Sequence, residues 1–183
     1  MRKVPAVLLL LLLGAAFTAA SGAELAPGEY EVKAAFLYNF AKFVEWPPEG
    51  WPAWKEGFVI TILGDDPFGA TIDDTLQGKT VDNRRVMVRR ARRPEDVGST
   101  QILFISDSEG EELSRVLKRL EGAAILTVGQ MDQFAERGGV IRFRMEKSRV
   151  RLEINPAAAE RAKLKISSEL LKLARIVGPG TGG

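Results

Sequence analysis

Three acidic side chains follow predicted buried strands, and their type and spacing come nearest to a chemical site in this sequence. Asp65 and Asp66 follow the apolar run FVITIL, and Asp107 follows QILFIS. In open α/β sheets, ligands bind beyond the carboxyl ends of the strands. Carboxylates gathered there could hold Mg²⁺, or could frame a small-ligand pocket together with Trp46. The same residues are typical of turns and helix caps, so we predict no metal site and no cofactor.

The composition excludes most side-chain catalysis, because the chain contains no histidine and no cysteine. Ser-His-Asp and Cys-His mechanisms are therefore impossible, and so are zinc sites built on thiolate or imidazole ligands. The glycines do not form a phosphate-binding fingerprint, since both the GxGxxG spacing and a Walker lysine are missing. These absences predict a binding protein that is not an enzyme.

A basic cluster occupies residues 84–93 and contains six arginines: Arg84, Arg85, Arg89, Arg90, Arg92 and Arg93. The segment RRVMVRR reads as a strand with a β-branched centre and charged ends. The cluster could bind an anion, a lipid headgroup or an acidic partner. It is equally typical of a strand whose exposed edge is protected from aggregation by charge.

The N-terminal residues have the pattern of a secretory signal peptide. Arg2 and Lys3 precede an apolar run at 7–13, and small residues follow as far as Ala23. We expect cleavage near Ala23 and a periplasmic location. The full chain has 26 Lys+Arg and 24 Asp+Glu, and the first 23 residues hold two of the basic residues and no acidic ones. The exported protein would therefore have no net charge, which argues against nucleic-acid binding.

Residues 29–45 predict a long helix that is apolar over most of its circumference. One stripe runs from Tyr30 to Val44 at helical spacing, and Phe36, Phe40 and Phe43 form a second. Both stripes could be core. Alternatively, the second stripe could meet a partner or a second copy of the chain. The prolines after Trp46 end the helix, and a tryptophan-rich loop follows.

Strands alternate with helices along the rest of the chain, with predicted strands at 58–63, 84–90, 101–106 and 124–128. This alternation predicts an α/β three-layer sandwich: a mainly parallel sheet with helices on both faces. Segments 140–145 and 149–154 predict an antiparallel hairpin at the sheet edge. Further helices are predicted at 109–121, at 131–137, from Pro156 with Asn155 as its cap, and over SELLKLARIV. We predict one domain over 24–177 and a disordered tail at 178–183.

Several stretches in order along the chain resemble the YfiR family of periplasmic regulators. They include KAAFLYNFAKFVEWP at 33–47, ITILGDDPFG at 60–69, FISDSE at 104–109 and LEINPAAAERAKLKISSELLKLA at 152–174. The resemblance implies a repressor that binds the periplasmic sensing part of an inner-membrane diguanylate cyclase. Its release would raise cyclic-di-GMP and favour biofilm formation. The family also implies an α/β sandwich and a homodimer.

The resemblance further implies a partner-binding surface near the C-terminus. The family's acidic-then-apolar pattern matches Glu160 and Ile166 here, with Leu170 as a supporting residue. The sequence departs from the best-known member in having no cysteines, so thiol-based sensing does not carry over. A small-ligand receptor, with its pocket at the carboxyl ends of the strands, is the alternative function.

Overall fold

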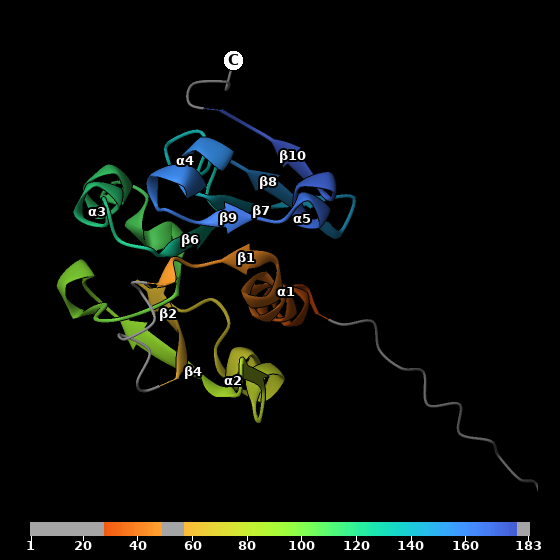
Figure 1. The fold of residues 1–183 in the computed structure, drawn as a ribbon. Coiled ribbons are helices and arrows are strands. Elements are labelled where there is room, and N and C mark those ends of the chain that lie inside the picture. Colours follow the sequence, from red (N-terminus) through yellow and green to blue (C-terminus); the bar gives the residue numbers. More distant parts are fainter. Residues whose placement is uncertain (1–27, 49–56, 179–183) are drawn as a thin grey trace, which may run out of the picture.

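The computed structural model describes residues 28–48 and 57–178, which form a main sheet covered by helices and a small second sheet (Figure 1). The helices are α1 (Glu29–Phe43), α2 (Ala70–Leu76), η2 (Pro94–Asp96), η3 (Asp107–Glu109), α3 (Leu113–Arg119), α4 (Pro156–Arg161) and α5 (Ser168–Lys172). The strands are β1 (Val44–Glu45), β2 (Phe58–Leu63), β3 (Thr80–Val81), β4 (Arg84–Ala91), β5 (Ile102–Ile105), β6 (Leu126–Gly129), β7 (Ile141–Glu146), β8 (Arg149–Ile154), β9 (Lys165–Ile166) and β10 (Ala174–Ile176).

The main sheet has eight strands in the order β10-β8-β7-β6-β5-β2-β4-β3. The pairs β2–β4, β2–β5, β5–β6, β6–β7 and β10–β8 are parallel, whereas β7–β8 and β3–β4 are antiparallel. β1 and β9 form a separate two-stranded antiparallel sheet. The predicted α/β fold with a mainly parallel sheet is therefore confirmed.

Two apolar cores lie on opposite faces of the sheet, because successive side chains of a strand point to opposite faces. Ile60 and Ile62 of β2 belong to the larger core, whereas Leu63 belongs to the smaller one. Helices α1, α2, α4 and α5 contribute to the larger core, and α3 contributes Leu113 and Val116 to the smaller. Helices thus cover both faces, as the alternation of the sequence predicts.

The C-terminal region differs from the sequence prediction in two elements. SELLKLARIV was predicted as one helix, but α5 ends at Lys172 and β10 follows, paired in parallel with Leu152–Ile154 of β8. β10 therefore forms the sheet edge, and the β7–β8 hairpin lies one strand inside it (Figure 1). Local helix propensity could not reveal this pairing, since the hydrogen-bonding partner is about twenty residues away in sequence.

A second difference is the segment 131–137, which was predicted as a short helix and consists of turns. Phe134 at its centre is fully buried, and its ring lies against the backbone of Gly129 and Gly139. A Cβ on Gly129 would come within 2.6 Å of that ring. Because Gly129 and Gly139 have no side chains, there is room between them for the Phe134 ring.

Some predictions fall outside the described residues: the leader at 1–23, the loop tryptophans Trp51 and Trp54, and tail residues 179–183. Within the described residues, no helix combines the length and the apolar character needed to cross a membrane.

Candidate functional site

The C-terminal segment is anchored by Asn155, a fully buried residue at the start of α4. Its side-chain oxygen accepts a hydrogen bond from the Ala158 amide at 3.0 Å. Its side-chain nitrogen donates to the Ala135 carbonyl at 2.7 Å. Pro156 occupies the first turn, where its missing N–H costs nothing. The predicted cap is confirmed, and it also fixes α4 to the turn segment before β7.

The segment after α4 is joined to the end of α1. β9 pairs antiparallel with β1, with Ile166 opposite Val44 and Lys165 opposite Glu45. The Ser167 amide donates to the Phe43 carbonyl at 2.8 Å. The Ser167 hydroxyl oxygen then caps α5 by accepting from the Leu170 amide at 3.2 Å. These bonds hold β9 and α5 at fixed positions, although neither element is long enough to be stable alone.

The three residues predicted to face a partner have different environments. Glu160 is exposed on α4, and Ile166 is partly buried against the larger core. Leu170 is only 3% exposed and belongs to that core. Leu170 therefore presents no exposed side chain to a partner, and its supporting role stays a prediction. The partner-facing prediction can apply only to Glu160 and to the exposed part of Ile166.

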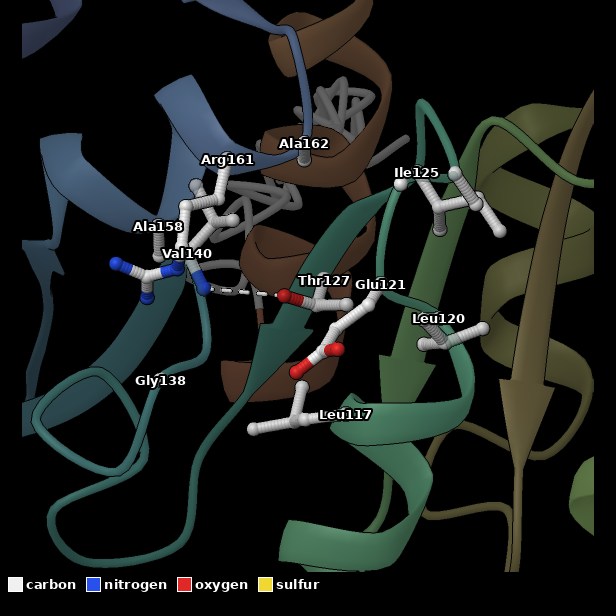
Figure 2. A pocket seen from close by; sticks show the side chains of 12 residues that line it. Leu117, Leu120, Glu121, Ile125, Thr127, Gly138, Val140, Ala158, Arg161 and Ala162 are labelled. Carbon is white, nitrogen blue, oxygen red and sulfur yellow. Dashed lines mark hydrogen bonds between the residues drawn. The ribbon is translucent and has the colours of Figure 1, made fainter.

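A groove of about 330 Å³ adjoins α4, between its residues and the end of α3 (Figure 2). Its apolar lining includes Leu117, Leu120, Ile125, Val140, Ala158 and Ala162. Glu121 and Arg161 bring opposite charges to its walls. Thr127 lies at the base, where its hydroxyl oxygen accepts from the Val140 amide at 3.0 Å. Arg161 follows Glu160 directly in sequence, so the groove borders the same short helix that carries the predicted partner residue Glu160.

The predicted phenylalanine stripe of α1 is not a single surface. Phe40 is fully buried and stacks on Phe143, with ring centroids 5.9 Å apart. It is part of the core because β7 lies beneath this side of the helix. Phe36 and Phe43 are partly buried. Phe36 also lines a depression of about 240 Å³ between α1 and Thr75 of α2.

The predicted acidic pocket is not assembled with Trp46. Trp46 is buried at the amino end of β2, where its ring meets Phe58 edge-on with centroids 5.5 Å apart. Asp65 and Asp66 follow the opposite end of that strand. The separation arises because α1 ends near the beginning of β2. Trp46 therefore cannot complete a pocket with the two aspartates.

The aspartates themselves make turn and ion-pair contacts. Asp66 accepts hydrogen bonds from the amides of Phe68 at 2.8 Å and Gly69 at 3.3 Å. Asp66 also pairs with Arg90 at 2.8 Å. Hydrogen bonds to Asp73 and, with a smaller effect, to Asp66 raise the pKa of the Arg90 guanidinium. Over residues 28–48 and 57–178, no cluster of three acidic side chains is suited to a metal ion.

The basic cluster is partly neutralised within this chain. Arg90 reaches Asp73 at 2.6 Å, and Arg93 pairs with Asp96 at 3.0 Å. Hydrogen bonding by Asp96 raises the pKa of Arg93. Among the described residues, β3 pairs with only Arg84 and Arg85 of β4, so most of β4 has no neighbouring strand on that side.

Sequence reasoning missed a polar cavity of about 480 Å³ beyond the carboxyl ends of β5 and β6. Lys33 of α1 is buried there, paired with Glu29, and donates to the Gln130 side chain at 2.6 Å. Gln130 in turn donates to Asp107 at 3.0 Å. Arg142 also lines the cavity. The only signal in the sequence was the four-residue spacing of Glu29 and Lys33, which does not predict burial.

A second missed feature is Glu153 of β8, a carboxylate that is 1% exposed and surrounded by three arginines. Arg142 approaches it at 3.0 Å, Arg144 at 3.2 Å and Arg175 at 3.1 Å. These residues come from three adjacent strands, β7, β8 and β10. The buried carboxylate therefore joins the short edge strand to the hairpin.

A model of the YfiR/HmsC-like family matches residues 30–175, which covers most of the chain and every element from α1 to β10 except their outermost residues. The chain belongs to this family. Membership supports a general role as a periplasmic regulator. YfiR/HmsC-like proteins are periplasmic, and the family is not one of known enzymes.

Solved structures resemble this YfiR/HmsC-like chain only at the level of the fold. A conserved domain protein from Vibrio cholerae has a TM-score of 0.53 at 12% identity, covering 81% of this chain and 60% of that one. The ABC domain from Streptococcus pneumonia in complex with L-Trp has a TM-score of 0.49 at 12% identity, covering 70% and 58%. The chain thus spans about three-fifths of each. No curated protein matches it.

Proposed function

We propose that this protein is a periplasmic repressor of an inner-membrane diguanylate cyclase. It binds the periplasmic sensing region of the cyclase and holds the enzyme inactive, which lowers cyclic-di-GMP and limits biofilm formation. The protein reaches the periplasm through cleavage of a leader near Ala23. The family match over residues 30–175 carries this proposal, since it includes the whole C-terminal surface.

The contact surface we propose consists of Glu160, the exposed part of Ile166 and the adjoining groove. The groove offers apolar area for a partner side chain, and Glu121 and Arg161 supply charges on its walls. Glu160 adds an exposed charge on the helix that carries Arg161. An apolar centre with a charged rim is the usual composition of a specific interface. The anchoring of α4 by Asn155 supports this assignment, because a rigid surface loses little entropy on binding.

Repression follows from a difference in affinity for two states of the cyclase. A regulator that binds the inactive conformation more tightly shifts the population toward it by that difference. A preference of about 5.5 kcal/mol would move the cyclase from 1:99 to 99:1 in favour of the inactive state. Release then requires only a signal that weakens this preference.

The experiment is a pull-down from solubilised inner membrane, with identification of bound proteins by mass spectrometry. Glu160→Arg reverses one exposed charge and places a cation near the carboxyl end of α4, which the helix tolerates. Glu111→Arg makes the same charge change at an exposed position before α3 and serves as the matched control. We expect the wild type and Glu111→Arg to recover a cyclase and Glu160→Arg to lose it. Equal recovery by all three proteins would exclude the proposed surface.

A small-ligand receptor is the second candidate, and the cavity around Lys33 and Asp107 favours it. That cavity lies at the carboxyl ends of parallel strands and combines a buried lysine with carboxylates and arginines. A thermal-shift screen of metabolites tests this candidate. A metabolite that raises the melting temperature, with no membrane protein recovered in the pull-down, would favour the receptor over the repressor.

We also propose that the protein is a homodimer. Phe36 and the depression it lines give α1 an apolar area, whereas the buried Phe40 cannot contribute. Sedimentation equilibrium of the wild type and of Phe36→Ser tests this interface. A monomeric wild type would contradict the proposal.

A further inference from the structure

The turn end of the β7–β8 hairpin carries an excess of positive charge. Residues 144–151, which we call the hairpin tip, have the sequence RMEKSRVR and a net charge of +3. Lys147 and Arg149 are exposed, and the Arg144 and Arg151 side chains are 36% and 52% exposed. This local excess contrasts with the balanced charge expected for the exported chain.

The register of the hairpin places two arginines directly opposite each other. Arg144 on β7 faces Arg151 on β8, on the side of the sheet away from the larger core. Like charges in directly opposed positions destabilise a sheet. Glu146 is the acidic side chain that contacts both, at 3.2 Å and 3.5 Å. One carboxylate therefore serves two guanidinium groups, and Arg149 and Lys147 add further positive charge nearby.

The next cross-strand pair on the same face of the hairpin shows how this chain neutralises arginines where folding requires it. Arg142 lies opposite Glu153, which is buried, and the two side chains form an ion pair. At the hairpin tip, Arg144 also reaches Glu153, whereas among the described residues Arg151 pairs only with the exposed Glu146. Local departures from favourable pairing are expected where a surface has a binding role.

An exposed apolar side chain accompanies the charges. Met145 is 41% exposed, and the alternation of the strand points it to the face opposite Arg144. At the end of the hairpin, the basic residues of one face and the exposed Met145 of the other lie close along the chain. Segments that lie at a membrane surface combine basic with exposed apolar side chains. Guanidinium groups also match phosphate geometry through paired hydrogen bonds.

We propose that the hairpin tip binds the phosphate groups of an anionic phospholipid surface. An acidic protein segment would share the charge complementarity but would not require the exposed Met145. Lipid binding would concentrate the protein at the membrane. It is independent of the proposed cyclase contact, which lies on α4 and β9.

The test is co-sedimentation with phosphatidylcholine vesicles that contain or lack phosphatidylglycerol, with the protein purified in the form that the cell exports. Each basic residue near an anionic surface contributes about five-fold to binding, so Arg149→Gln/Arg151→Gln should lower it about 30-fold. Arg115→Gln/Arg119→Gln removes the same charge from an exposed part of α3 and should change binding by less than about two-fold. Thermal melts of all three proteins verify folding.

Preferential binding to the phosphatidylglycerol vesicles, lost in the hairpin variant and weakened by salt, would support the proposal. Equal sedimentation with both kinds of vesicle would overturn it, as would unchanged binding by the hairpin variant. If the wild type ignores vesicles but binds polyglutamate through the same arginines, the surface recognises an acidic polypeptide and the lipid proposal is wrong.

Discussion

Replacing Asn155 by alanine should destabilise the protein more than the loss of an ordinary helix cap. The substitution removes the cap on the Ala158 amide, which costs about 1 kcal/mol. It also leaves the Ala135 carbonyl without the donor that Asn155 supplies in a fully buried position, which costs about 1–3 kcal/mol more. The expected loss in the free energy of unfolding is therefore about 2–4 kcal/mol.

Urea denaturation followed by circular dichroism measures this loss. With a typical slope of about 2 kcal/mol per molar urea, the midpoint should fall by about 1–2 M. Ser167→Ala is the matched control. The Ser167 side chain caps α5 through one hydrogen bond and makes no second one with the described residues. It should cost about 1 kcal/mol. A loss for Asn155→Ala no larger than that for Ser167→Ala would refute the reasoning that Asn155 fixes α4 to the segment before β7.

Four further substitutions, one of them a surface control, test the packing described above by the same denaturation measurement. Gly129→Ala should cost about 1–3 kcal/mol, because the added methyl group meets the buried Phe134 ring at 2.6 Å, and a neutral result would mean that the ring moves freely. Glu153→Gln should cost about 3 kcal/mol, since it leaves three arginines around a buried neutral group, and unchanged stability would show that the arginines turn to solvent. Leu170→Ala should cost about 2–5 kcal/mol, whereas Glu160→Ala should stay within about 0.5 kcal/mol of wild type. The reverse order for Leu170 and Glu160 would contradict their placement in core and surface.

The layers of the fold were predictable because their signals are local and strong. FVITIL and ILFI are continuous apolar runs, and both form strands buried on two faces. Asn155 followed by Pro156 indicated the start of α4. The hairpin was predicted from two alternating segments around a short turn, and its strands begin within one residue of the expected positions.

Features that depend on distant partners were not predictable. β10 is a strand because β8 offers it a free edge, and no pattern within LARIV shows that. The burial of Lys33 depends on Gln130, which lies 97 residues away. Trp46 and Asp66 were assigned to one pocket because the sequence does not show that α1 ends beside the beginning of β2.

The proposed functional site also combines features that the sequence could predict with features that it could not. Glu160 and Ile166 were identified by resemblance, and the structure places one on the surface and the other partly in the core. The groove beside α4 was not foreseen, because its walls come from α3, β6, the segment before β7, and α4. Only the folded chain brings these segments together.

Cyclic-di-GMP in living cells is the measurement that tests the proposed repression most directly. Cells that lack this chain should contain more cyclic-di-GMP than cells that express it. Expression of Glu111→Arg should restore the low level, whereas Glu160→Arg should leave it as high as in the deletion. An unchanged cyclic-di-GMP level on deletion would contradict the proposed function, and full restoration by Glu160→Arg would contradict the proposed surface.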